Sequence, residues 1–170
     1  MNLFPWFLFA HVLGAIIAFG PSFSMPLIGA MGAKERQHAN YGLRVSERLA
    51  KVQILPLAIV QGFTGVALIV TGNIDLFAAK WLLLAIVLYL IAIGYSIFVQ
   101  TPTLKKVIAM TSGGPPPGTS GPTGAVAAGG PPAGGPPPEL AATIKRLQQG
   151  GMLLLVLIIS IVLLMVVKPF

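Results

Sequence analysis

The sequence predicts an all-α fold, a transmembrane four-helix bundle with kinked helices, in a single domain of 170 residues. Hydrophobic residues make up 55% of the chain and charged residues only 9%, whereas soluble proteins carry about 25% charged residues. The apolar residues gather in four stretches, at about 3–29, 52–72, 81–100 and 151–167, each close to the ~20 residues that a bilayer core requires. We therefore expect a protein solvated mainly by lipid.

The first apolar stretch is expected to remain as a membrane span. Its N-terminus has no basic segment and no small-residue cleavage site, so it does not resemble a cleaved signal peptide. Pro5 lies where a helix is predicted to begin, and a proline there removes no intrahelical hydrogen bond. Pro21, Pro26 and Pro56 lie deeper in the apolar stretches and predict kinks, because each removes one backbone donor.

The second span is preceded by a polar segment, residues 37–52, that predicts a helix leading into the membrane. Arg44, Arg48 and Lys51 have helical spacing and fall on one face of it. A basic face at the edge of a span is typical of a helix that meets anionic lipid headgroups.

The last two spans are joined by a low-complexity, Gly/Pro-rich loop within the domain, residues 111–138. Nine prolines and nine glycines among its 28 residues cannot bury enough apolar surface to form a core. We expect a spacer, with a docking segment for a neighbouring protein as the alternative. Pro138 and Glu139 then predict the start of a helix that continues into the last span.

The distribution of lysine and arginine predicts the orientation of the spans. Nine of the eleven lie in the two loops on one side of the membrane, and only Lys80 and Lys168 lie on the other. The positive-inside rule assigns the nine to the cytoplasm. We expect a multi-pass protein of the bacterial cytoplasmic membrane with both termini outside the cytoplasm. Because the positive charge flanks the spans, membrane lipid and not nucleic acid is the expected partner.

Several kinds of chemistry lack their residues in this chain. All four acidic residues fall outside the spans, namely Glu35, Glu47, Asp75 and Glu139. A carboxylate-bridged metal pair, a relay of buried acids and a Ser/His/Asp site are therefore not expected within the bilayer. The absence of cysteine removes disulfides, thiolate ligands and covalent haem attachment. No catalytic residue is predicted, and the sequence leaves open whether the protein is an enzyme.

The most informative residue is His11, which is the one ionisable side chain in the first span. An ionisable group in hydrocarbon costs a few kcal/mol or more, so a functional role is the first hypothesis. His11 lies about eight residues, or roughly 12 Å, below the outer end of its span. Gln61, Thr64, Tyr89 and Ser160 are expected at the same depth and would complete a polar layer. In the alternative, each hydroxyl bonds a carbonyl of its own helix.

Small residues follow His11 along its face of the helix, at Gly14, Ala15 and Ala18. They would let two helices approach closely, or leave room for a flat macrocycle. Neutral imidazole is a common axial ligand of haem iron. Three roles for His11 stay open: a metal ligand to haem b, a structural hydrogen-bonded histidine, and proton handling or binding of another metal. His38, on the cytoplasmic side, is expected to be a solvated surface histidine.

The first span resembles the opening helix of the HemJ-type protoporphyrinogen oxidases. His11 and Pro26 keep that family's offset of fifteen residues, with Phe23 and Met25 at matching positions. The terminal VVKPF, residues 166–170, also resembles the ending of that family. The resemblance implies a four-helix membrane protein with b-type haem on His11.

The chain departs from that family at two positions. Leu27 stands where the family has an arginine, and Ala85 stands where it has a lysine. Since such charges suit porphyrin carboxylates, their absence predicts that the chain does not oxidise protoporphyrinogen. A closer resemblance is to a family of predicted bacterial four-helix integral membrane proteins, through the early leucine/histidine segment, Thr71–Gly72, Trp81 and the terminal lysine-proline.

The leading expectation is a membrane protein that binds b-type haem for electron transfer or porphyrin-linked redox chemistry. His11 would be the axial ligand, and the polar residues at its depth would line the pocket. Lys80 or Lys168 would meet the propionates at the outer surface. The alternative is a non-catalytic accessory subunit of a larger membrane complex, or a homo-oligomer, and a transporter ranks third.

Overall fold

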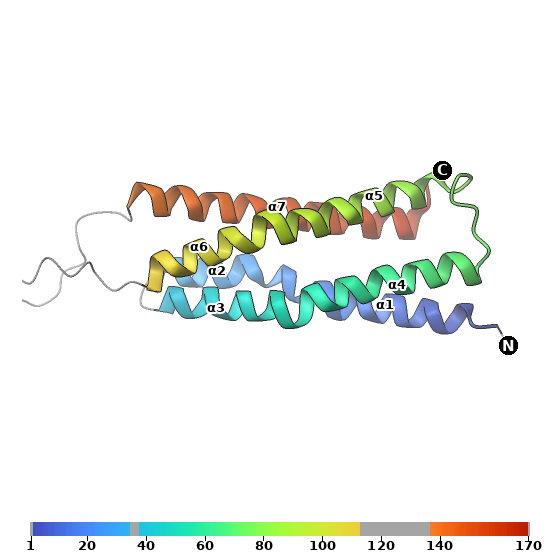
Figure 1. Ribbon diagram of the computed structural model, residues 1–170, viewed down its shortest axis with the longest axis horizontal. Coiled ribbons are helices and arrows are strands. Elements are labelled where there is room, and N and C mark those ends of the chain that lie inside the picture. Colours follow the sequence, from blue (N-terminus) through green and yellow to red (C-terminus); the bar gives the residue numbers. More distant parts are fainter. Residues whose placement is uncertain (1, 35–37, 113–136, 170) are drawn as a thin grey trace, which may run out of the picture.

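The computed structural model describes residues 2–34, 38–112 and 137–169, and all regular elements within these ranges are helical. Four helical segments are long and apolar enough to cross a membrane, namely Phe4–Gly32, Ala39–Thr71, Lys80–Ser112 and Pro138–Val167. They lie alongside one another as a bundle, which confirms the predicted all-α transmembrane fold (Figure 1). The first segment begins and the last segment ends at the same end of the bundle (Figure 1).

The first segment is interrupted where the sequence predicts a kink. It comprises α1 (Phe4–Phe19), the 3₁₀ turn η1 (Gly20–Phe23) and α2 (Met25–Lys34). Pro21 lies in η1, and Pro26 lies in the first turn of α2, where its missing N–H leaves no intrahelical bond unmade. The kink predicted at Pro21 is therefore present as a break between two helices.

The second and third segments share a local design. The second comprises α3 (Ala39–Leu49), the π-helical turn η3 (Ala50–Ile54) and α4 (Leu55–Thr71). The third comprises α5 (Lys80–Tyr95), the π-helical turn η4 (Ser96–Gln100) and α6 (Thr101–Ser112). Each π turn ends two residues before a proline, Pro56 or Pro102. A π turn changes the hydrogen-bond pattern of the helix. The chain therefore continues as a helix past a proline that has no N–H to donate.

The fourth segment is the single helix α7 (Pro138–Val167), which Lys168 ends with a left-handed backbone at φ 46°. It begins with the proline and the glutamate that predicted a helix start. The low-complexity loop expected at 111–138 lies largely outside the described residues. Of that range, Thr111 and Ser112 belong to α6, and Pro138 belongs to α7.

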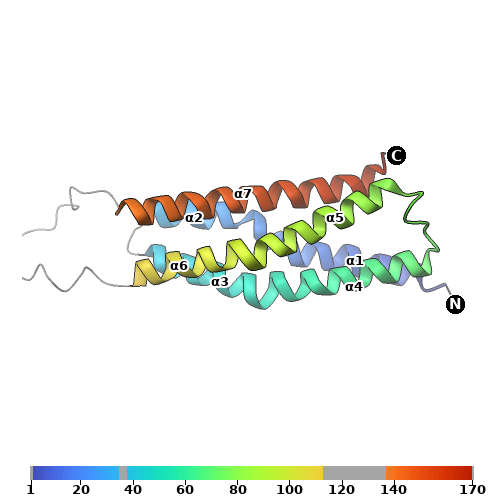
Figure 2. The same cartoon turned by 45° about the horizontal axis from the view of Figure 1, so that its top comes forward.

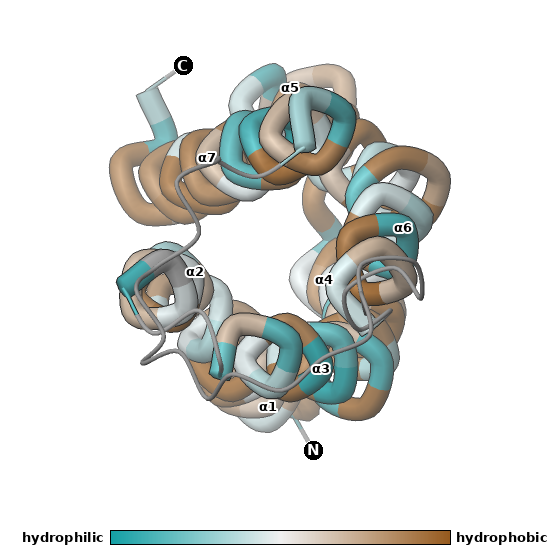
Figure 3. The backbone as a smooth tube through the Cα atoms, turned by 90° about the vertical axis from the view of Figure 1, so that its left-hand side faces the viewer, coloured by the Kyte–Doolittle hydropathy of each residue, from teal (hydrophilic) through white to brown (hydrophobic). Residues whose placement is uncertain are grey.

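The helices are arranged differently at the two ends of the bundle (Figures 1 and 2). At the end that carries most of the lysines and arginines, α2, α3, α6 and α7 each contact two neighbours and close a ring. At the other end, α1 packs along α4, and α5 packs along α7. Backbone contact between these two pairs is sparse there. Figure 3 looks along the bundle from the basic end, where hydrophilic residues mark the ends of the helices.

In each helix pair, a glutamine side chain donates a hydrogen bond to a backbone carbonyl of the neighbouring helix. Gln53 Nε2 donates to the Ile17 carbonyl at 2.9 Å, and Gln100 Nε2 donates to the Leu147 carbonyl at 3.1 Å. Ile17 is four residues before Pro21, so its carbonyl is the acceptor that the proline leaves without an α-helical donor. Gln53 thus satisfies the backbone group that the kink in the first segment exposes.

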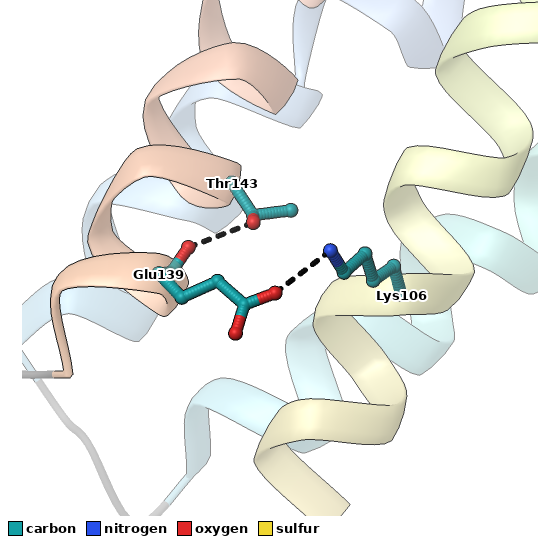
Figure 4. Close-up of polar contacts among 3 residues, drawn as sticks. All are labelled: Lys106, Glu139 and Thr143. Atoms are coloured by element: carbon teal, nitrogen blue, oxygen red, sulfur yellow. Dashed lines mark hydrogen bonds and ion pairs between the residues drawn. The ribbon is translucent and has the colours of Figure 1, made fainter.

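Polar contacts also join the helices of the basic ring. Asn40 in α3 donates to the Ile108 carbonyl and to Thr111 of α6, at 3.2 and 2.8 Å. Lys106 of α6 and Glu139 of α7 form an ion pair at 2.9 Å, beside Thr143 (Figure 4). Both charged groups are largely exposed to the surroundings, so this pair contributes about 0–1 kcal/mol.

We predict that Gln53→Ala destabilises the bundle in detergent by about 1–3 kcal/mol, because it leaves the Ile17 carbonyl without a donor. The same substitution should cost less in a Pro21→Ala background, since residue 21 could then supply the backbone N–H. Thermal or denaturant unfolding of the four proteins of this double-mutant cycle measures the difference. Equal costs in both backgrounds would show that Gln53 does not compensate for Pro21.

Candidate functional site

His11 lies on α1 at the contact with α4 and is half-buried. Its ring nitrogen Nδ1 is 2.9 Å from Thr64 Oγ1 on α4. The ring also lies over Gly65, where an added Cβ would be 3.4 Å from His11 Cε1. A small residue at position 65 therefore gives the imidazole its place between the two helices.

The Thr64 hydroxyl has two acceptors within reach. Thr64 Oγ1 is 3.1 Å from the Gln61 backbone carbonyl and 2.9 Å from His11 Nδ1. A hydroxyl has one hydrogen, so the tautomer of His11 depends on which of the two receives it. When Thr64 donates to the carbonyl, Nδ1 carries the ring hydrogen and Nε2 keeps the lone pair, which is the tautomer that a metal ligand requires.

Gln61 is the second member of the cluster and is only 6% exposed. Its Nε2 donates to the His11 backbone carbonyl at 2.6 Å, so it fixes α1 against α4 at the level of the histidine. Its Oε1 is buried and has no hydrogen-bond partner among the described residues. Gly14 makes room for that amide, because a Cβ there would lie 2.7 Å from Oε1.

Tyr89 connects the two helix pairs. Its hydroxyl, on α5, donates to the Ala58 carbonyl of α4 at 2.7 Å. The side chain passes Gly62, where an added Cβ would lie 2.7 Å from the hydroxyl oxygen. Ala58 is three residues before Gln61 on α4, so Tyr89 meets that helix within one turn of the His11 cluster.

Ser160 does not join this cluster through a hydrogen bond. Its hydroxyl donates to the Val156 carbonyl of its own helix at 2.8 Å. This is the alternative to a shared polar layer, in which a hydroxyl bonds a carbonyl of its own helix. Of the five residues predicted to share a layer, the structure brings His11, Gln61 and Thr64 into direct contact. Tyr89 lies about one turn away, and Ser160 is bonded elsewhere.

The small residues beside His11 serve helix packing. Ala18 is fully buried, and Gly14 faces the Gln61 amide. At the end of the bundle that carries the chain termini, Lys168 Nζ lies 5.6 Å from the centre of the Trp81 ring, a cation–π contact between the C-terminal end of α7 and the start of α5. Within residues 2–34, 38–112 and 137–169, no group of three histidine, cysteine, aspartate or glutamate side chains could hold a metal ion.

Two glutamines with a structural role were not singled out from the sequence, Gln53 and Gln100. A signal was available, since an amide inside an apolar stretch needs a partner and both stand two or three residues before a proline. The carbonyl that each one reaches depends on helix pairing. That choice could not be obtained from one sequence.

Comparison with known proteins identifies one family. The family model described as "Predicted integral membrane protein (DUF2269)" matches residues 6–112, from the first turn of α1 to the end of α6. The matched range includes His11, Gln61 and Thr64. No curated protein matches the chain, and no solved structure matches it. The resemblance to the HemJ-type oxidases has no support from these comparisons.

We predict opposite effects for two glycine-to-alanine substitutions. Gly62→Ala should destabilise the bundle by about 1–3 kcal/mol, because the added methyl group displaces the Tyr89 hydroxyl from a buried carbonyl. Gly94→Ala on α5 is the matched control, since nothing lies within 4 Å of its added Cβ. It should be neutral or stabilise the helix by up to about 1 kcal/mol. Thermal unfolding in detergent compares the two, and similar effects would contradict the close packing at Gly62.

Proposed function

The chain belongs to the DUF2269 family of predicted integral membrane proteins, and we propose that it binds b-type haem through His11 for electron transfer or porphyrin-linked redox chemistry. The observation that carries the proposal is the state of the imidazole. Thr64 engages Nδ1, which leaves Nε2 as the nitrogen that would bind a metal. An imidazole held at one nitrogen by a hydrogen bond is the usual arrangement of a histidine that ligates a metal through the other.

His11 is the residue that would hold the haem iron. A neutral imidazole would bind iron without placing a charged side chain in the membrane. This suits the apolar stretches, which hold no acidic residue to balance such a charge. The outer half of the bundle consists of two helix pairs in sparse backbone contact. A flat cofactor between helices is a recurrent solution in such bundles. Lys168, at the outer end of α7, is a cation for a propionate.

The orphaned acceptor of Gln61 gives independent support for a functional role. A buried, unpaired carbonyl oxygen costs about 1–3 kcal/mol of stability. The unpaired Oε1 therefore offsets part of the stability that the Nε2 bond to α1 contributes, and such departures are concentrated at functional sites. By bonding the His11 backbone, Gln61 positions the histidine, and by bonding the ring, Thr64 orients it. When bound, haem would supply one-electron redox chemistry.

The test is the absorption spectrum of the full-length protein purified after haem-replete expression. We expect a b-type spectrum that is lost or greatly weakened in His11→Ala and kept in His38→Ala, the other histidine of the chain. A colourless protein that is folded and thermally stable would overturn the proposal. That result would favour the accessory-subunit alternative.

A pair of threonine substitutions distinguishes a positioned ligand from a general structural effect. Thr64→Val removes the hydroxyl that bonds His11 and should broaden or shift the haem spectrum and weaken haem retention by about tenfold. Thr71→Val on the same helix removes a hydroxyl that bonds only its own helix, at the Ala67 carbonyl, and should leave the spectrum unchanged. If both variants alter the spectrum alike, His11 is not oriented by Thr64.

Orientation forms a second part of the proposal, with the basic end in the bacterial cytoplasm and both termini outside. Its support is the separation of charge, because Arg44, Arg48, Lys105 and Lys106 lie on α3 and α6 at one end, while Lys80 and Lys168 lie at the other. This separation of the basic residues along the bundle axis is the pattern that the positive-inside rule describes.

We predict that single cysteines report this orientation, since the chain has no cysteine of its own. Phe77→Cys, at a residue that is 85% exposed between α4 and α5, should react with a membrane-impermeant maleimide in intact cells. Lys145→Cys, near the start of α7, should react only after the membrane is permeabilised. The reverse pattern would invert the topology and move His11 to the cytoplasmic half.

A further inference from the structure

A groove lies between the second and third helical segments at the basic end of the bundle. It has a volume of about 190 Å³, space for a group of several non-hydrogen atoms when a water occupies about 30 Å³. Its lining comes from α3, η3, α4 and α6, through Glu47, Ala50, Lys51, Leu55, Thr101, Leu104 and Lys105. The groove is remote in sequence from His11 and does not depend on haem binding.

The lining of the groove changes from basic to apolar along the bundle axis. Lys51 and Lys105 are exposed at its edge, whereas Leu104 is buried at its floor. Leu55 follows Lys51 by one helical turn in the direction of the membrane interior. A ligand that fits this order has an anionic group at one end and a hydrocarbon chain at the other.

The charge around the groove is poorly compensated. Arg44 and Arg48 extend the basic edge, since they line a second, adjoining hollow with Glu47 and Lys51. In the part of the chain that the structure describes, one lysine–carboxylate ion pair joins Lys106 and Glu139, and neither residue lines the groove. Among the described residues that line the two hollows, four cations accompany one carboxylate, that of Glu47, so the lining carries an excess positive charge.

The depth of the groove matches a lipid headgroup. A helix crosses the ~30 Å hydrocarbon core in about 20 residues at 1.5 Å each. Counting inward from Thr71, where the second segment ends, 20 residues reach position 51. Counting from Lys80, where the third segment begins, they reach about position 100. Both counts arrive at the groove, so Lys51 and Lys105 lie at the level of the phosphates, and Leu55 lies at the first carbons of the acyl chains.

We propose that this groove is a binding site for one anionic phospholipid. The headgroup phosphate lies between Lys51 and Lys105, and an acyl chain follows Leu55 and Leu104 toward the bilayer interior. Arg44 and Arg48 strengthen the preference for an anionic headgroup without lining the groove floor. The bound lipid lies beside the contact between α3 and α6, where α3 gives way to the π turn η3.

The proposal is tested by titrating the full-length protein with lipids and observing retained lipid by native mass spectrometry. Phosphatidylglycerol should bind at one site, and phosphatidylcholine with the same acyl chains should bind at least tenfold more weakly. Lys51→Gln and Lys105→Gln should each weaken phosphatidylglycerol binding about fivefold, as expected from about 1 kcal/mol for each basic residue near the headgroups. Thermal unfolding without added lipid establishes that the variants are folded.

The matched control is Lys145→Gln with Arg146→Gln, which removes two charges from the basic part of α7 but not from the groove. This double variant should keep the affinity within twofold. An equal loss in the control would show general attraction to a basic surface and overturn the site. Equal binding of both lipids would overturn it as well.

A soluble headgroup distinguishes a lipid from a free phosphate. Glycerol 3-phosphate at millimolar concentration should neither displace phosphatidylglycerol nor raise the unfolding temperature, because it lacks the chain that the apolar floor accepts. Displacement at concentrations comparable to those of the lipid would show that the groove recognises a soluble phosphate, and the lipid assignment would be wrong.

Discussion

The hydrogen bond from the Gln61 amide to the His11 carbonyl is the contact on which the half of the bundle that carries the chain termini depends. Within hydrocarbon, apolar side chains gain little by leaving lipid for one another, so helix pairing relies on close packing and polar contacts. Gln61 supplies the polar contact, and Gly14 permits the close approach. The position of the imidazole follows, because Thr64 and Gly65 on the same helix meet its ring only when α1 and α4 are held in this register.

A small number of polar contacts also connects the helices in the rest of the molecule. Each helix pair is fastened by an amide that reaches a backbone carbonyl, Gln53 and Gln61 in one pair and Gln100 in the other. Tyr89 then joins the pairs across a separation that the backbones themselves do not bridge. These carbonyls are either already bonded within their own helices or freed by a proline. The side-chain contacts therefore connect the helices without taking any backbone N–H from its own partner.

The sequence predicted the parts of this structure that depend on composition. Four spans, the break at Pro21 and the proximity of His11 to Gln61 and Thr64 follow from hydropathy, proline chemistry and the rise of a helix. Ser160 shows the limit of depth arithmetic, because depth fixes the level of a residue but not the direction of its side chain. The partners of Gln53 and Gln100 were beyond prediction for a related reason. Which carbonyl is nearest depends on helix rotation, and the π turns change that rotation.

The two π turns have a consequence for how faces of these helices are assigned. A π turn holds one residue more than an α turn, so it advances the helix by about 100° relative to an uninterrupted α-helix. Residues before Ala50 and after Ile54 that are seven apart in sequence therefore do not share a face. A helical wheel drawn through the whole second segment would align the basic stripe of α3 with the wrong side of α4. Between relatives, a gap of one residue is most readily accommodated at these turns, where it would re-phase one half of a helix and leave the other in place.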